Sequence, residues 1–94
     1  MNTESAVHGN ELAIAAMLQD AIATDLELAP GQRLDWHTSF VELGLDSAAV
    51  VAVSGAAGQR LGLEVPPEWL FDHPTIHGLA QFLARKTSPE EDRV

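Results

Sequence analysis

The chain of 94 residues contains no cysteine. This absence excludes disulfide bonds, thiolate metal sites and a cysteine nucleophile, and it is compatible with a reducing compartment. Any redox chemistry that relies on the protein's own thiols is therefore excluded.

Basic residues are also scarce. Five Lys and Arg residues stand against fourteen Asp and Glu residues, which gives a formal net charge of −9. Such a charge repels the phosphates of nucleic acids and anionic membranes, and it favours partners with basic surfaces. We therefore expect no binding to nucleic acids. The acidic residues are unevenly distributed, because Arg60 is the only charged residue between Ser47 and Leu63.

Long apolar runs are absent as well. No run approaches the ~20 residues that a membrane-spanning helix needs, and the N-terminus lacks the basic and then apolar pattern of a signal peptide. We expect a cytoplasmic, monomeric protein without membrane contact. A chain of 94 residues forms one small domain with little room for a deep catalytic cleft.

Apolar residues at helical spacing predict a first helix over residues 11–26, with Asn10 as its N-cap. A connection of about twenty residues follows over 27–46, which is long for a compact domain and needs anchors of its own. The apolar residues available as anchors are Leu34, Trp36, Phe40, Leu43 and Leu45.

Residues 47–61 predict a second helix with two different faces. The spacing of Val50, Val53, Ala57 and Leu61 indicates the buried face. The opposite face carries small, uncharged residues, namely Ala48, Val51, Ala52 and Gly55. This second face is either a plain solvent-facing surface or a surface that another protein approaches closely.

The rest of the chain predicts two more helical segments. Pro67 is placed to start a short turn of helix over 68–71, and Thr75 is placed to cap a last helix that runs to about Lys86. The predicted fold is all-α, a small bundle of three main helices and one short helix with a long first loop. The domain is expected over residues 10–86, between a mobile tail of residues 1–9 and an acidic tail of residues 87–94.

The segment from Phe40 to Ser47 carries the main candidate site. Gly44 permits backbone angles closed to other residues, Asp46 can cap the following helix, and Ser47 then lies in its first turn. Unpaired backbone N–H groups and the helix dipole favour a negative group there, so a phosphate ester would be stabilised. The same residues also make an ordinary helix cap, and this pattern alone leaves both interpretations open.

Taken in order, the motifs are more specific than any one of them. The chain resembles the acyl carrier proteins over roughly residues 11–85, and more closely the carrier domains of modular polyketide synthases than those of fatty acid synthesis. The resemblance is carried by Phe40 with Leu43-Gly44-Leu45-Asp46-Ser47, by Leu61-Gly62-Leu63-Glu64-Val65-Pro66, by Leu70-Phe71-Asp72-His73-Pro74-Thr75-Ile76, and by Leu79-Ala80.

This resemblance implies that a phosphopantetheinyl transferase attaches 4′-phosphopantetheine to Ser47. The thiol of that arm would carry acyl groups as thioesters, and the protein itself would not be an enzyme. Asp46 would help to position the transferase and its metal. The resemblance also implies that partner enzymes, such as an acyltransferase or a ketosynthase, contact Leu45, Ala48, Val51 and Ala52.

Three alternatives compete with this interpretation. Peptidyl carriers of nonribosomal synthetases share the fold but usually have a second glycine in place of Leu45. An unmodified interaction module is favoured by Ala48, because the family typically has Leu or Met there. A serine hydrolase would pair Ser47 with His37, His73 or His77, but the chain lacks a Gly-x-Ser-x-Gly elbow. The Pro between His73 and His77 argues against a two-histidine metal face, so no metal site is expected.

Overall fold

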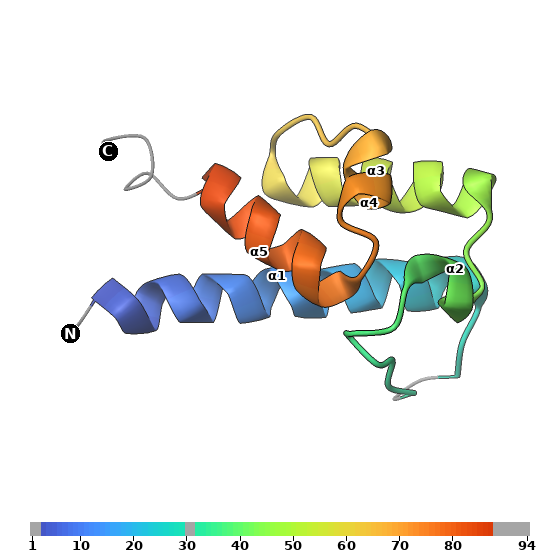
Figure 1. Ribbon diagram of the computed structural model, residues 1–94, viewed down its shortest axis with the longest axis horizontal. Helices are drawn as coiled ribbons and strands as arrows, with labels where there is room; N and C mark the ends of the chain where they lie inside the picture. The colour runs from blue at the N-terminus through green and yellow to red at the C-terminus, as the bar shows by residue number, and fades with distance from the viewer. Residues whose placement is uncertain (1–2, 30–31, 88–94) are drawn as a thin grey trace.

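The computed structural model describes residues 3–29 and 32–87. Its helices are α1 (Thr3–Leu26), α2 (Phe40–Leu43), α3 (Ser47–Leu61), α4 (Glu68–Asp72) and α5 (Ile76–Thr87), as Figure 1 shows. Over the described residues the β-structure is limited to an isolated bridge between Ser39 and Thr75. The predicted all-α bundle is therefore confirmed.

The core lies where α1 packs against α3 and α5. Leu18 and Ile22 of α1 are fully buried, and so are Leu79 and Leu83 of α5. Their spacing of four residues places each pair on one helical face. Burial of these faces stabilises the bundle, because about 25 cal/mol is gained for each Å² of apolar surface removed from water.

The helix α1 begins earlier than its sequence pattern predicts. It starts at Thr3, so the predicted N-terminal tail is helical from that residue on, and Asn10 is inside the helix. The Asn10 side-chain amide instead donates a hydrogen bond to Thr87 Oγ1 at 3.3 Å. Apolar periodicity reveals only the part of a helix that packs on the core. The residues before Asn10 contain no proline that would interrupt the helix. Residues 1–2 and 88–94 of the two predicted tails lie outside the described residues.

The predicted connection 27–46 contains a helical turn, α2, that its pattern does not reveal. The Ser39 hydroxyl caps this turn by accepting a hydrogen bond from the Glu42 N–H at 3.2 Å. Gly44 ends it with a φ of 107°, and its N–H donates to the carbonyls of Phe40 and Val41. A four-residue helix spans about one turn, which is too short for a periodic apolar pattern.

Hydrogen bonds fix this connection to α1 and to the start of α5. The Trp36 indole Nε1–H donates to Gln19 Oε1 at 2.7 Å. The Phe40 N–H donates to the Pro74 carbonyl at 2.7 Å, and the His77 N–H donates to the Trp36 carbonyl at 2.9 Å. Trp36 and Phe40 thus act as the anchors that a connection of this length requires, as predicted.

The last two helices match their predicted starts. Pro67 precedes α4, and Thr75 Oγ1 accepts a hydrogen bond from the Gly78 N–H at 3.0 Å at the start of α5. The Trp69 ring of α4 meets the Phe82 ring of α5 edge-on at 4.9 Å between centroids. This aromatic contact joins the short helix to the main bundle.

Candidate functional site

Ser47 is the first residue of α3, and its side chain is exposed. Asp46 precedes it in an extended conformation, and Asp46 Oδ1 accepts a hydrogen bond from the Ala49 N–H at 2.9 Å. The predicted N-cap is therefore confirmed. The Asp46 carbonyl accepts from the Val50 N–H at 2.9 Å, so the N–H groups of Ser47 and Ala48 precede the first helical hydrogen bond.

The turn before Ser47 is held by its backbone. The Leu45 N–H donates to the Phe40 carbonyl at 3.0 Å, which closes α2 against the start of α3. Gly44 has open space where a Cβ would stand, so its positive φ is what favours glycine at this position. Figure 1 shows α2 beside the end of α3 at which Ser47 lies. Phe40 and Leu45 point into the core while Ser47 faces solvent.

The structure separates the four residues that the resemblance assigned to partner contact. Ala48, Val51 and Ala52 are exposed on one face of α3, and Val51 leaves 56% of its surface open. Leu45 is only 4% exposed and belongs to the core cluster. The backbone between α2 and α3 turns this side chain inward, whereas the other three residues of the set face outward.

The short helices carry exposed apolar residues that were not predicted from the sequence. Val41 of α2 is 75% exposed and Phe71 of α4 is 61% exposed. Each directly follows a buried residue in a short helix, Phe40 and Leu70 respectively. Gly44 marks the end of α2 and Pro67 the start of α4, but helices of four and five residues offer no apolar period from which the outward positions could be assigned.

The histidines considered as partners of Ser47 make other contacts. His37 and His77 pack against each other with ring centroids 4.5 Å apart. His73 stacks on Phe82 at 4.3 Å. Within the described residues, no group of three or more His, Asp or Glu side chains is placed to hold a metal ion.

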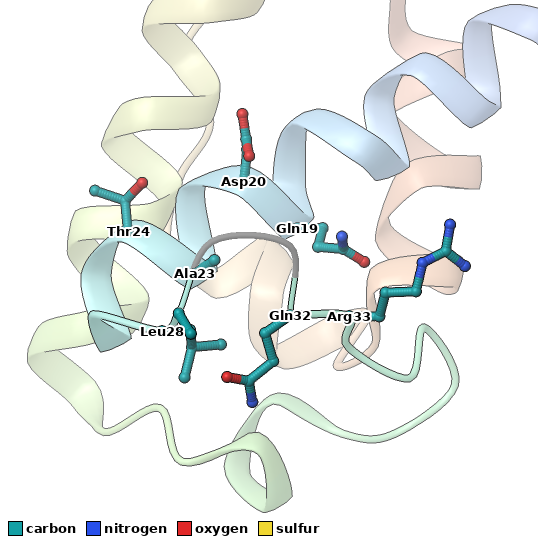
Figure 2. Close-up of a pocket in the computed structure, with 8 residues that line it drawn as sticks. Gln19, Asp20, Ala23, Thr24, Leu28, Gln32 and Arg33 are labelled. Carbon is teal, nitrogen blue, oxygen red and sulfur yellow. The ribbon is translucent and has the colours of Figure 1, made fainter.

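Two open hollows lie away from Ser47. One, of about 400 Å³, is lined by α1 and the loop after it, and Figure 2 shows the polar groups of Gln19, Asp20, Gln32 and Arg33 around it. The other is lined by the second half of α3 and by residues 62–65. Neither is lined by Ser47, whose side chain is exposed. None of the helices in the described part of the chain has both the length and the apolar character needed to cross a membrane.

Comparison with known families identifies the class of domain. Residues 16–83 match the family model described as "Phosphopantetheine attachment site". This stretch covers most of the chain, including α3 and the turn before it. The chain therefore belongs to this family, whose members carry covalently attached 4′-phosphopantetheine, and the predicted carrier domain is confirmed.

Similar sequences occur in polyketide synthases. A phenolphthiocerol/phthiocerol polyketide synthase protein of Mycobacterium tuberculosis is 38% identical over 74 residues, which cover 79% of this chain and 4% of that protein. The polyketide synthase PksM of Bacillus subtilis is 37% identical over 67 residues, which cover 71% of this chain and 2% of that protein. The chain thus corresponds to one small part of these much longer proteins.

A solved structure confirms the carrier fold. A free-standing peptidyl carrier protein from an uncharacterized secondary metabolic pathway of Acinetobacter baumannii superposes with a TM-score of 0.78 at 29% identity. The match covers 84% of this chain and 98% of that one. The chain is therefore a carrier domain of the polyketide synthase type in its sequence, with a fold that peptidyl carriers share.

Proposed function

We propose that this protein holds polyketide-type acyl groups as thioesters on a 4′-phosphopantetheine arm attached to Ser47. The observation that carries the proposal is the position of this serine. It is exposed at the first residue of α3, directly after the capping residue Asp46, and inside the region that matches the family model.

The residues around Ser47 fit a phosphate group. The first turn of α3 contains no acidic residue, and the N–H groups of Ser47 and Ala48 precede the helical hydrogen bonds. A helix N-terminus of this kind favours a negative group. The Asp46 carboxylate already accepts the Ala49 N–H, so it holds the helix start in place beside the serine. When bound, the arm supplies the thiol that this cysteine-free chain lacks.

The other residues of this region would serve the partners. Ala48, Val51 and Ala52 form an exposed, uncharged strip on α3, which favours docking through shape and apolar contact. The net charge of −9 adds long-range attraction to basic partner surfaces. We expect a phosphopantetheinyl transferase to dock here, and then an acyltransferase or a ketosynthase. Catalysis would rest with these partners in the cytoplasm, and the carrier would act as a monomer.

A second candidate function is that of a peptidyl carrier. It is favoured by the superposition on the peptidyl carrier protein of Acinetobacter baumannii. The two functions differ in the enzyme that loads the arm, because aminoacyl groups come from an adenylating enzyme and polyketide acyl groups from an acyltransferase. Loading assays with both enzyme types on the modified protein would therefore separate them.

The attachment is tested by intact-protein mass after incubation with coenzyme A, Mg²⁺ and a phosphopantetheinyl transferase. The parent protein is expected to gain one phosphopantetheinyl group and Ser47→Ala none. Ser54→Ala is the matched control, because Ser54 lies in the same helix with its hydroxyl bonded to the Val51 carbonyl, and it should be modified like the parent. Absence of modification in folded parent protein, also with a transferase from the same source, would favour an unmodified interaction module.

A further inference from the structure

Two histidines that play no part in the carrier site lie against each other. The rings of His37 and His77 have centroids 4.5 Å apart and planes tilted by 39°. His37 belongs to the connection before α2, and His77 belongs to the first turn of α5. Figure 1 shows this connection passing beside the start of α5. The fold thus brings together two imidazoles that are forty positions apart in the sequence.

Backbone hydrogen bonds hold both histidines in place. The His77 N–H donates to the carbonyl of Trp36, the residue directly before His37, at 2.9 Å. The His37 N–H donates to Asp35 Oδ1 at 2.9 Å. Trp36 is itself fixed by its indole hydrogen bond to Gln19. The proximity of the rings therefore follows from a tethered backbone on both sides.

We infer that His37 and His77 together bind a divalent transition-metal ion such as Zn²⁺. Neutral imidazole is a preferred ligand of Zn²⁺, Cu²⁺ and Ni²⁺, with a metal–nitrogen distance of about 2.0 to 2.1 Å for zinc. Two nitrogens that share one ion therefore lie within about 4 Å of each other. Rings at the observed separation reach this arrangement by rotating about their side-chain bonds. His37 is exposed and His77 is half-buried, so the ion has access from solvent.

The surroundings favour a cation. The Asp35 carboxylate lies next to His37 and accepts the hydrogen bond from its backbone N–H at 2.9 Å. The negative charge of this carboxylate attracts a positive ion to the His37 side of the pair. With two protein ligands, water fills the remaining coordination positions.

The bound ion would join two parts of the chain. One ligand comes from the connection that leads to α2, and the other comes from α5. An ion that needs both ligands binds the folded state and not the unfolded chain, so it raises stability by mass action. The expected readout is thus both a binding isotherm and an increase in the melting temperature.

The test uses the full chain before phosphopantetheine attachment, so that the thiol of the arm cannot bind the metal. Calorimetric titration with ZnCl₂ at pH 7.5 is expected to show one ion per protein, and thermal unfolding should move to higher temperature. MgCl₂ at the same concentration should have no such effect, because Mg²⁺ prefers oxygen ligands. This result does not depend on Ser47 or on the carrier function.

The variants His37→Gln and His77→Gln keep a side chain of similar size and should each weaken Zn²⁺ binding at least tenfold. His73→Gln is the matched control, since His73 stacks on Phe82 elsewhere, and it should bind like the parent. Circular dichroism verifies that every variant is folded. If Zn²⁺ does not bind the parent, or binds both His37 and His77 variants unchanged, the inference is wrong. Should either variant not fold, NMR of the parent protein provides the test. If Zn²⁺ does not shift the C2-proton signals of His37 and His77, the inference is wrong.

Discussion

Two glycines of α3 serve opposite purposes. Gly58 is half-buried and lies so close to the chain after the helix that a Cβ there would be 2.8 Å from the Leu63 carbonyl oxygen. Gly55, one turn earlier, is exposed and has open space where a Cβ would stand. Gly58 permits close packing. Gly55 leaves the exposed face that also carries Ala48 and Ala52 without a bulky or charged side chain at this position. Composition alone cannot separate these roles, because both glycines weaken the helix equally.

The largest contrast is expected between two valines of this helix. Val53→Ala should lower the free energy of unfolding by about 2 to 3 kcal/mol, because Val53 is 1% exposed and its truncation removes buried apolar contacts. Val51→Ala on the outer face should change it by less than about 0.5 kcal/mol. Urea unfolding of both variants checks the comparison, and equal losses would show that the two faces are not distinct.

The two glycines should respond in opposite directions to the same substitution. Gly58→Ala should destabilise by about 1 to 3 kcal/mol, since the backbone at Leu63 must move away. Gly55→Ala should stabilise by about 1 kcal/mol through helix propensity. Thermal and urea unfolding measure both changes. Stabilisation by Gly58→Ala would mean that the chain after α3 gives way easily.

The capping residue should link stability to modification. Asp46→Ala removes the acceptor for the Ala49 N–H and should lower stability by about 1 kcal/mol. Asp46→Asn keeps a side-chain oxygen at this position and should retain most of that stability. If Asp46 also positions the transferase, both variants should be modified more slowly than the parent at equal folded fraction. Unchanged modification rates in both would confine Asp46 to its structural role.

A substitution on the exposed face of α3 should affect docking while changing stability the least. Val51→Asp places a charge on the exposed strip and should leave the free energy of unfolding within about 0.5 kcal/mol of the parent. It should nevertheless lower kcat/KM of the phosphopantetheinyl transferase severalfold, because the docking strip is no longer uncharged. Gln59→Asp, at an exposed position near the other end of α3, is the matched control. Equal transferase kinetics for both variants would exclude the strip as the docking surface.

The faces of the long helices and their capping residues could be predicted from the sequence. The inward or outward orientation of side chains in short segments could not. The faces of α3 follow from the spacing of Val50 and Val53, and the caps Asp46 and Thr75 follow from side-chain chemistry next to a helix start. The helix α2 spans four residues and offers no period. The orientation of Leu45 depends on how α2 closes on α3, which its place in the motif does not indicate.

Contacts between distant segments were the least predictable. The proximity of His37 and His77 depends on the hydrogen bond from the His77 N–H to the Trp36 carbonyl, which no local pattern encodes. The early start of α1 at Thr3 also lacks a signal, because the residues before Asn10 show no apolar periodicity. Pattern analysis finds elements that bury one face, and it does not find elements or pairs fixed by tertiary hydrogen bonds.

The bond from the Phe40 N–H to the Pro74 carbonyl has a consequence for protein synthesis. Pro74 is added 34 residues after Phe40, so the turn that leads to Ser47 lacks this contact while the chain is still emerging from the ribosome. Only after Pro74, which lies just before α5, has left the exit tunnel can this turn be completed. A nascent chain would thus acquire its finished serine turn late, at nearly the same time as the last helix that closes the bundle.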